Sequence, residues 1–344
     1  MTDSAGTPER VTFAEIRTLF EELPGPDVEA FDAAVKRDRM LTKPPGALGR
    51  LEELAFWLAG WQGRQPPRVD HPRVCVFAGN HGVAARGVSA FPPEVTGQMM
   101  QNFVAGGAAV NQLTAMVDGD LRIYEMALDE PTADFTQGPA MDEETCARAM
   151  TYGMMAVEQG VDLLALGEMG IGNTTAAAAI CHALYGGSPE DWTGPGTGVT
   201  GAAYAAKVAA VGDGVAANRA ALDDPLDVLR CLGGQELAAI AGAVLAARLA
   251  RIPVLLDGYT CCAAAAVLHA VDPSLLDHCR IGHLSAEPAH AALAERLGQR
   301  PLLNLDMRLG EASGAALAIH IVRAAALCHA DMATFADAGV AGPG

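Results

Sequence analysis

The stretch LLALGEMGIGNTTAAAAI, residues 163–180, contains the signal that decides the fold. An apolar run ends in glycine, a polar turn follows, and an alanine-rich helical pattern begins. A strand that turns directly into a helix is the repeating unit of a parallel sheet covered by helices. The turn also carries the carboxylate of Glu168 and three small polar side chains at 173–175. A simple connection does not need these groups, so the corner is a candidate ligand site.

Similar apolar runs recur along the chain after residue 72, separated by longer amphipathic or alanine-rich stretches. This alternation predicts an α/β fold with a parallel sheet and helices on both faces. The stretches EVTGQMMQNFVAGGAAVNQL (94–113) and QELAAIAGAVLAARLA (235–250) have helical spacing of apolar residues. The expected strands are VCVFAG (74–79), LRIYEM (121–126), DLLALG (162–167), IPVLLDG (252–258), CRIGHLS (279–285) and LLNLDM (302–307).

Both ends of the chain are helical in pattern. Residues 13–23, 28–41 and 48–61 have the spacing of amphipathic helices, and 312–330 is an alanine-rich helix. The segment QGRQPPRVDHP, residues 62–72, is rich in proline and charge and predicts a linker. We expect residues 71–311 to form the main domain, with 1–70 as a helical segment and 312–344 as a helix with a loose tail.

Composition narrows the class of partner. The 344 residues are 51% hydrophobic and 5% aromatic, with a net charge of −18 and no dense Lys/Arg stripe. This argues against nucleic acid or an anionic membrane as the main partner, although an anionic small molecule remains open. No apolar run approaches the roughly 20 residues of a membrane helix. We expect a cytoplasmic protein.

The eight cysteines form no CxxC pair, and most lie in apolar runs. They are interpreted as small buried hydrophobic residues in a reducing compartment. The alternative is a zinc site at the neighbouring pairs Cys181–His182 and Cys328–His329. Adjacent residues rarely point at one metal, so this spacing is unfavourable. We expect neither a metal nor a cofactor.

Polar side chains follow five of the apolar runs. Ligands bind beyond the carboxyl ends of the strands in open parallel sheets, so these residues should converge on one pocket. They are Asn80 and His81; Glu168 and Asn173–Thr175; Asp257 and Tyr259; Ser285 and Glu287; and Arg308 and Glu311.

Each corner has a structural and a functional interpretation. Asn173, Thr174 or Thr175 can cap the helix or hold a phosphate oxygen at the helix N-terminus. No GK[ST] motif is present, which disfavours nucleotide hydrolysis. Lys207, after the glycine-rich TGPGTGV (193–199), is either a solvated charge or a phosphate ligand. His81 is either a general base or a loop-stabilising residue.

Glu311 follows the last apolar run and precedes a helix of small residues. A carboxylate at a helix N-terminus normally acts as an electrostatic cap with a lowered pKa. If it faces an apolar pocket, desolvation raises the pKa and gives a usable base.

Taken together, several motifs resemble one enzyme family in the same order along residues 40–325. KPPGALGRLE, GNHGV, GVSAFPPEVTGQMMQNFVAGGAAVN, GEMGIGNTT, PVLLDGYT and LDMRLGEASGAALA are similar to the nicotinate-nucleotide–dimethylbenzimidazole phosphoribosyltransferases, known as CobT. The resemblance implies a homodimer with a Rossmann-like large domain and a small helical domain built from both chain ends. It also implies transfer of phosphoribose from nicotinate mononucleotide to 5,6-dimethylbenzimidazole, with inversion at the anomeric carbon.

The resemblance assigns roles to particular residues. Glu311 is implied as the catalytic base. The phosphate and ribose would be held by Glu168, Gly170, Gly172, Asn173, Thr174, Thr175 and Lys207. The acceptor base would be held by Asn80, His81, Ser89, Met169 and Arg308.

The chain departs from the usual family motifs at four positions. Ala47 replaces Ser, Asn80 replaces Asp, and Ala312 and Ser313 replace Gly-Thr. The Asn80 change leaves the preferred acceptor open. Rival interpretations are a related phosphoribosyltransferase for adenine or a phenol, and a non-catalytic nucleotide-binding subunit. The presence of Glu311 argues against the second rival.

Overall fold

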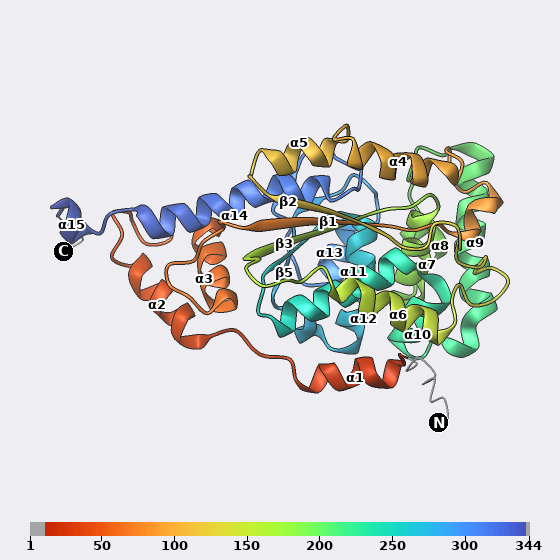
Figure 1. Cartoon of the computed structure of the whole chain (residues 1–344), viewed down its shortest axis with the longest axis horizontal. Helices are drawn as coiled ribbons and strands as arrows, with labels where there is room; N and C mark the ends of the chain where they lie inside the picture. The colour runs from red at the N-terminus through yellow and green to blue at the C-terminus, as the bar shows by residue number, and fades with distance from the viewer. Residues whose placement is uncertain (1–10, 342–344) are drawn as a thin grey trace, which may run out of the picture.

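The computed structural model describes residues 11–341 and contains a five-stranded parallel sheet with helices on both faces (Figure 1). The strand order is β2-β1-β3-β4-β5, and every neighbouring pair is parallel. The expected α/β class is therefore confirmed. The strands are β1 Pro72–Ala78, β2 Asp120–Glu125, β3 Leu163–Met169, β4 Val254–Leu256 and β5 Cys279–Ile281.

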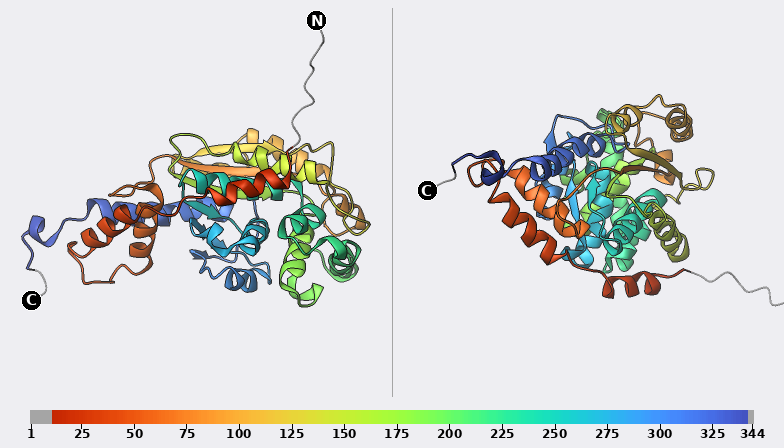
Figure 2. Two further views of the ribbon diagram at one scale, coloured as in Figure 1. Left: turned by 90° about the horizontal axis from the view of Figure 1, so that it is seen from below. Right: turned by 60° about the vertical axis from the view of Figure 1, so that its left-hand side comes forward.

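The sheet separates two hydrophobic cores, and side chains of β1 alternate between them. Cys75 and Phe77 pack into the core formed with α6 Glu143–Met154, α11 Gln235–Leu249 and α12 Tyr259–Val271. Val74 and Val76 pack into the core formed with α3 Arg50–Gln62, α5 Ala109–Ala115 and α14 Ser313–Asp331. Burial on both faces explains the apolar runs in the inner strands β1, β3 and β4, whereas the edge strand β2 is partly exposed and carries charged residues. Figure 2 shows the helices on either side of the sheet.

The other helices are α1 Phe13–Glu21, α2 Val28–Asp38, α4 Glu94–Val104, α7 Asn173–Tyr185, α8 Pro189–Trp192, α9 Gly201–Asn218, α10 Pro225–Leu232, α13 His290–Arg296 and α15 Phe335–Ala338, with short 3₁₀ turns at Gly82–Arg86, Arg219–Ala221 and Pro273–Leu276. Among them, α7 and α10 also contribute buried residues to the core with α12.

Three of the expected elements differ in the structure. CRIGHLS is not one strand: β5 Cys279–Ile281 lies in the main sheet, and β6 His283–Leu284 lies outside it. LLNLDM does not join the main sheet: β7 Leu303–Asn304 pairs with β6 His283–Leu284 in a separate two-stranded parallel sheet. A Cβ on Gly282 would lie 2.8 Å from Ala315 Cα, so the chain passes close to α14 as it leaves β5. The continuous helix expected at 94–113 is two helices, because Gly106 adopts a left-handed φ of 79° and ends α4.

The N-terminal helices have two different neighbours. α2 and α3 pack against each other and against α14. α1 instead contacts α6, where Phe13 N–H donates to Glu143 Oε1 at 2.9 Å and Arg17 pairs with Asp224. The helix expected at 312–330 is observed as α14, and its apolar length alone would allow it to span a membrane. It packs inside the fold against α3 and β3, as core helices do. The division into domains stays a prediction.

The segment after α14 is anchored before the end of the chain. Thr42 N–H donates to Ala333 O at 3.1 Å, and Phe335 N–H donates to Met40 O at 2.9 Å. These bonds tie the part of the tail at 333–335 to the loop that follows α2. The last residues of the expected loose tail, 342–344, lie outside the described residues, as do residues 1–10 of the N-terminal segment.

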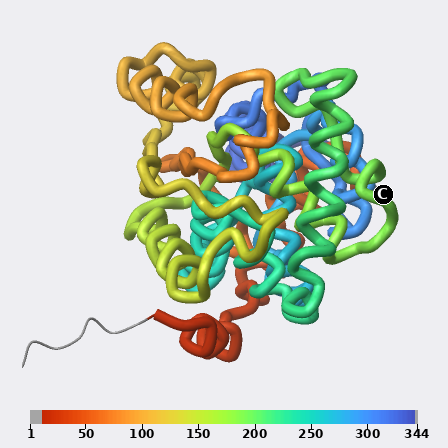
Figure 3. Tube along the Cα trace, turned by 90° about the vertical axis from the view of Figure 1, so that its right-hand side faces the viewer, coloured from red at the N-terminus to blue at the C-terminus, as the bar shows by residue number. Residues whose placement is uncertain are grey.

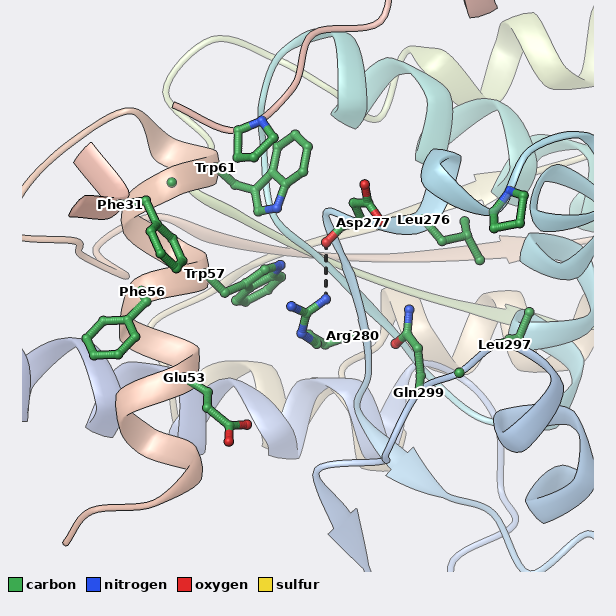
Figure 4. Close-up of a pocket in the computed structure, with 14 residues that line it drawn as sticks. Phe31, Glu53, Phe56, Trp57, Trp61, Leu276, Asp277, Arg280, Leu297 and Gln299 are labelled. Carbon is green, nitrogen blue, oxygen red and sulfur yellow. Dashed lines mark hydrogen bonds between the residues drawn. The ribbon is translucent and has the colours of Figure 1, made fainter. Parts of the chain in front are cut away.

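A cleft of about 500 Å³ lies between α3 and the segment that surrounds β5 (Figure 4). Trp57 and Trp61 project from α3 toward it, and the Arg280 guanidinium lies 5.0 Å from the ring centroid of Trp57. The Arg248 guanidinium carbon lies over the ring of Trp61, 4.3 Å from its centroid. These contacts fix α3 to the rest of the fold.

Candidate active site

A second cavity, of about 400 Å³, lies beyond the carboxyl ends of β3, β4 and β6. Figure 3 looks onto this edge of the molecule. Four of the five corners expected to converge do contribute to its wall. The lining residues are Phe91, Val95, Met99, Glu168, Met169, Gly170, Ile171, Asn173, Thr174, Gly196, Thr197, Gly258, Tyr259, Thr260, His283, Ser285, Glu287, Arg308, Leu309, Gly310 and Glu311.

Glu311 occupies an unusual backbone position at the start of α14. Gly310, Glu311 and Ala312 have consecutive left-handed φ values of 79°, 61° and 57°. Non-glycine residues rarely adopt this region, so the turn must be held by its surroundings. The Glu311 N–H donates to Glu168 O at 3.0 Å, and Ser313 Oγ donates to Gly310 O at 2.7 Å. The turn aims the Glu311 side chain into the cavity.

Glycines allow this turn to lie against the sheet. A Cβ on Gly167 would overlap the backbone of Ala312, and a Cβ on Gly314 would overlap the ring of His283. A Cβ on Gly310 would lie 2.7 Å from Glu168 Oε1. The close approach of the two acidic corners therefore depends on residues without side chains.

Glu168 and Glu311 are both buried, yet their hydrogen bonds differ. The Asn173 amide donates to the Glu168 carboxylate. Among residues 11–341, no side chain or backbone group hydrogen-bonds or pairs with the Glu311 carboxylate. A carboxylate without a partner keeps both oxygens available for a proton on a bound molecule.

Burial raises the pKa values of the acids in this region. For Glu168, burial is the largest cause, and the negative charge of Asp257 adds to it, so the pKa rises to about 8. Burial and the charge of Asp257 raise the pKa of Glu311 to about 7. A carboxylate with a pKa near neutrality is suited to general-base chemistry.

The predicted phosphate corner is only partly turned toward the cavity. Thr174 lines the cavity, and its hydroxyl accepts a 2.8 Å hydrogen bond from Lys207 Nζ. The Thr175 side chain points into the interior and is fully buried, and its hydroxyl has no hydrogen-bond partner within the described residues. The N–H groups of Asn173 and Thr175 donate to the carbonyls of Gly170 and Gly172. Of the three polar side chains at 173–175, Thr174 is thus the best placed to contact an anion together with Lys207.

Lys207 does not line the cavity and is almost fully buried. Burial lowers its pKa to about 8, and Glu287 opposes this effect. Burial also raises the pKa of Glu287. A desolvated ammonium group favours an anion nearby, because the anion restores the interactions that burial removed. The solvated-charge interpretation of Lys207 is wrong.

The loop at 193–199 closes over this corner. Glu287 Oε1 accepts from Gly196 N at 2.8 Å, and Arg308 Nη1 donates to Gly196 O at 3.0 Å. A Cβ on Gly196 would lie 2.6 Å from both Lys207 Nζ and Thr174 Oγ1. Arg308 and Lys207 thereby bring two cations to one side of the cavity in an otherwise acidic protein.

Comparison with known proteins agrees with this geometry. A phosphoribosyltransferase family model matches residues 23–340. The nicotinate-nucleotide–dimethylbenzimidazole phosphoribosyltransferase of Rhizobium etli (strain CIAT 652) is 60% identical over 330 residues, covering 96% of this chain and 97% of the relative. The Brucella canis (strain ATCC 23365 / NCTC 10854 / RM-666) enzyme of that name is 57% identical over 328 residues, covering 95% and 97%. The chain belongs to this phosphoribosyltransferase family.

A solved structure supports the same assignment. The crystal structure of the enzyme from Thermus thermophilus superimposes with a TM-score of 0.84 at 43% identity, covering 92% of this chain and 100% of that one. The family resemblance found in the motifs, and the α/β architecture expected from them, are therefore confirmed.

Three residues expected at the acceptor side of this phosphoribosyltransferase do not line the cavity. Asn80 borders a different cleft, and its amide donates to Leu128 O at 3.0 Å. His81 is buried, and its Nε2 lies 2.5 Å from Glu236 Oε1. Ser89 Oγ lies 3.1 Å from Thr197 Oγ1, and Thr197 does line the cavity. The loop-stabilising interpretation of His81 fits this geometry better than the general-base one.

The sequence interpretation missed an apolar wall of the cavity. Phe91 lies in the loop before α4, Val95 and Met99 lie on α4, and Leu309 lies on the turn before Glu311; all four line the cavity. Phe91 and Leu309 are more than half exposed, at 52% and 55%, which is unusual for large apolar side chains. The i, i+4 spacing of Val95 and Met99, after a phenylalanine next to two prolines, is the sequence signal that could have identified this wall.

Metal binding has no obvious site in the described part of the chain. Among residues 11–341, no group of three or more His, Cys, Asp or Glu side chains is arranged to hold a metal ion. Seven of the eight cysteines are buried, and Cys328 is partly exposed. That the reaction needs no metal stays a prediction.

Proposed function

We propose that this enzyme transfers the phosphoribosyl group of nicotinate mononucleotide to 5,6-dimethylbenzimidazole, giving nicotinate and α-ribazole 5′-phosphate. Relatives that are 57–60% identical over nearly the whole chain carry the name of this activity. The observation that carries the proposal is the Glu311 carboxylate, which lines a cavity that also has apolar lining residues and which has no hydrogen-bond or ion-pair partner among residues 11–341.

The chemistry needs one base and no general acid. One ring nitrogen of the acceptor attacks the anomeric carbon as the bond to the pyridinium nitrogen of nicotinate mononucleotide breaks. The electron pair of the broken bond stays on the departing ring and neutralises its positive charge. The other acceptor nitrogen loses its proton to Glu311. Attack from the face opposite the leaving group gives inversion.

The phosphate is best placed beside Thr174. The Thr174 hydroxyl, the Lys207 ammonium and the Arg308 guanidinium lie around the loop at Gly196. The N-terminus of α7 adds its partial positive charge to the same corner. Charge-assisted hydrogen bonds of this kind contribute roughly 1.5–3 kcal/mol each. Gly170 and Asn173 line the cavity next to Thr174, and Gly172 begins the helix.

The aromatic acceptor is best placed against the apolar wall. Phe91, Met99 and Leu309 offer apolar surface, and Met169, which follows Glu168 in the chain, also lines the cavity. Asn80 and His81 act indirectly in this proposal, since they hold the loop that leads to Phe91. Assembly as a homodimer and a cytoplasmic location, which the family resemblance implies, belong to the same proposal.

The proposal is tested by incubating the purified protein with nicotinate mononucleotide and 5,6-dimethylbenzimidazole, adenine or a phenol. Product masses are then compared. We expect α-ribazole 5′-phosphate and nicotinate in equal amounts, with the benzimidazole preferred in competition. If adenine or the phenol is used faster at equal concentration, the acceptor assignment is wrong. If no base gives a riboside phosphate, the activity itself is wrong.

A further inference from the structure

Asp257 directly follows β4 and precedes Gly258, which lines the cavity; Asp257 itself does not line it and has no exposed surface. Its backbone continues the sheet, since Asp257 N–H donates to Leu166 O at 3.0 Å. Its side chain leaves the sheet toward α14, where Oδ1 accepts a 2.8 Å hydrogen bond from Ala315 N–H. An ionisable group with no exposed surface is costly to keep, so its position needs a reason.

The contact with α14 fixes the beginning of that helix. Ala315 lies in the first turn of α14, where backbone N–H groups have no partner within the helix. The N–H groups of Gly314 and Ala312 also lower the pKa of Asp257, although burial, the largest effect, raises it to about 7. A carboxylate at this place meets both the free N–H groups and the positive end of the helix dipole. Asp257 therefore holds the turn that aims Glu311.

The same carboxylate acts on both acidic corners of the cavity. After burial, the negative charge of Asp257 is the largest cause that raises the pKa values of Glu168 and Glu311. Glu236 on α11 also raises the pKa of Glu168, but it is not among the causes for Glu311. Asp257 is thus the group shared by the two corners.

The other groups around Asp257 do not neutralise it. His283 Nε2 on β6 lies 3.5 Å from Asp257 Oδ1, and burial lowers the pKa of His283. The neighbouring His290 has a pKa lowered to about 3 by burial and by His283, so it is also neutral near pH 7. On α12, the thiols of Cys261 and Cys262 have pKa values raised well above 9 by burial and stay uncharged.

We propose that Asp257 is a positioning residue for the transfer reaction: it anchors the start of α14, and with it Glu311, and supplies the negative charge against which Glu311 ionises. The proposal rests on the proposed function, in which Glu311 takes the acceptor proton. It assigns Asp257 no contact with either substrate. Its expected signature is therefore a changed acid limb in the pH profile rather than a loss of substrate binding.

The test compares Asp257→Asn with Ser313→Ala and the wild type. Asp257→Asn keeps the shape and removes the charge, whereas Ser313→Ala removes a neutral hydrogen bond from the same turn. The turnover number is measured from pH 5 to 9 at saturating nicotinate mononucleotide and 5,6-dimethylbenzimidazole. Circular dichroism and melting temperature report on folding, and calorimetry reports on nucleotide binding.

In the wild type, we expect the acid limb of the turnover profile to have its midpoint near pH 7, which is the pKa of Glu311. In Asp257→Asn the limb should move down by roughly one pH unit, because removal of a nearby negative charge makes Glu311 easier to ionise. The plateau should fall about tenfold, since the base is weaker and less well placed. Nucleotide affinity should stay within about threefold of the wild type. Ser313→Ala should leave the acid limb of the pH profile at the wild-type position, even if its maximal turnover changes.

A folded Asp257→Asn protein with an unmoved acid limb overturns the proposal. If the variant does not fold, carbon-13 NMR of wild-type protein with labelled glutamate decides instead, with the Glu311 signal assigned by its absence in Glu311→Gln. The proposal is supported if the Glu311 chemical shift titrates with a midpoint near pH 7 and shows a second inflection caused by Asp257. It is overturned if the Glu311 shift titrates in a single step at the pKa of an ordinary glutamate. The titration needs no turnover, so failure of the proposed function itself would be seen separately, as an inactive wild type.

Discussion

The two acidic corners of the cavity are built from similar sequences and have different structures. GEMGIGNTT and RLGEASGAA both bring a glutamate, glycines and a helix start to the same edge of the sheet. Glu168 is the next-to-last residue of a regular strand, and Asn173 donates to its carboxylate. Glu311 lies in a left-handed turn, and its carboxylate has no partner in the described chain.

The difference teaches which of two buried acids can work as a base. Glu168 has the higher pKa, about 8, so it is mostly protonated near pH 7. Glu311, at about 7, is ionised in a larger fraction of molecules and is not hydrogen-bonded within the described protein. A base must be both ionised and within reach of the proton. The carboxylate of Glu311, which has no partner in the described chain, therefore favours it as the base, and the following experiments test that distinction.

The largest effect is expected for Glu311→Gln, which keeps the size of the side chain and removes its basicity. General-base assistance is typically worth about 10²–10⁴-fold in rate, so the turnover number should fall by that order. Nucleotide affinity should hardly change, because the amide still fits the turn. Steady-state kinetics and calorimetry measure the two quantities. A variant that keeps more than about half of the wild-type turnover would place the base elsewhere, with Glu168 first.

The second effect concerns the anion side of the Glu168 corner. Thr174→Val removes the hydroxyl beside Lys207, and nicotinate mononucleotide should bind at least about tenfold more weakly. Thr175→Val is a matched control, since the Thr175 hydroxyl is buried and has no hydrogen-bond partner in the part of the chain that the structure describes. Its affinity should stay within about threefold of the wild type. Calorimetry on both folded variants is the measurement, and equal losses in the two would contradict the assignment to Thr174.

A smaller effect is expected for Glu168→Gln. Because the folded pKa of Glu168 is raised from 4.5 to about 8, the folded protein binds more protons than the unfolded chain between these pH values. The free energy of unfolding then falls as the pH rises through this window. A glutamine at position 168 carries no charge at any pH, so the variant does not lose this part of its free energy of unfolding as the pH rises. The melting temperature of the variant should match the wild type near pH 5 and exceed it by at least about 2 °C at pH 9.

The activity of Glu168→Gln should sharpen the comparison further. At pH 7 the glutamine resembles the protonated acid, so turnover should fall less than about tenfold. A loss as large as that of Glu311→Gln would mean that the two corners share the proton transfer. If Glu168→Gln lost more turnover than Glu311→Gln, Glu168 would be the base and Glu311 the supporting acid.

The smallest effect is expected from metal removal. Departure of nicotinate neutralises its own ring charge, and a single base suffices, so no divalent ion is needed at either corner. Turnover should stay within about twofold of the untreated enzyme after exhaustive EDTA treatment and dialysis. A loss that one particular metal restores would show that neither carboxylate acts alone.

The sequence was informative where local pattern determines structure. The buried strands are short apolar runs, and the rule that ligands bind beyond the ends of parallel strands brought Glu168 and Glu311 together correctly. LLNLDM is an apolar run of the same kind, yet it lies outside the main sheet. The apolar pattern does not specify which strand a short run will pair with.

Other features depend on contacts between distant segments. His81 is paired with Glu236, which lies 155 positions further along the chain and has no motif of its own. Thr174 and Thr175 are neighbours in sequence, but the rotation of α7 turns one toward the cavity and the other inward. The burial of Lys207 on an alanine-rich helix depends on the loop at Gly196. These relations become visible only once the segments are placed in space.

The placement of the tryptophans has a practical consequence for optical measurements. The chain has three, and Trp57 and Trp61 lie at the cleft beside α3. Trp192 lies elsewhere, and its carbonyl accepts a 2.8 Å hydrogen bond from the hydroxyl of Tyr259, which lines the candidate active-site cavity. Intrinsic fluorescence is therefore a mixture of two signals with different origins. A W57F/W61F protein would emit from Trp192 alone, which turns the unlabelled enzyme into a single-fluorophore reporter of substrate binding.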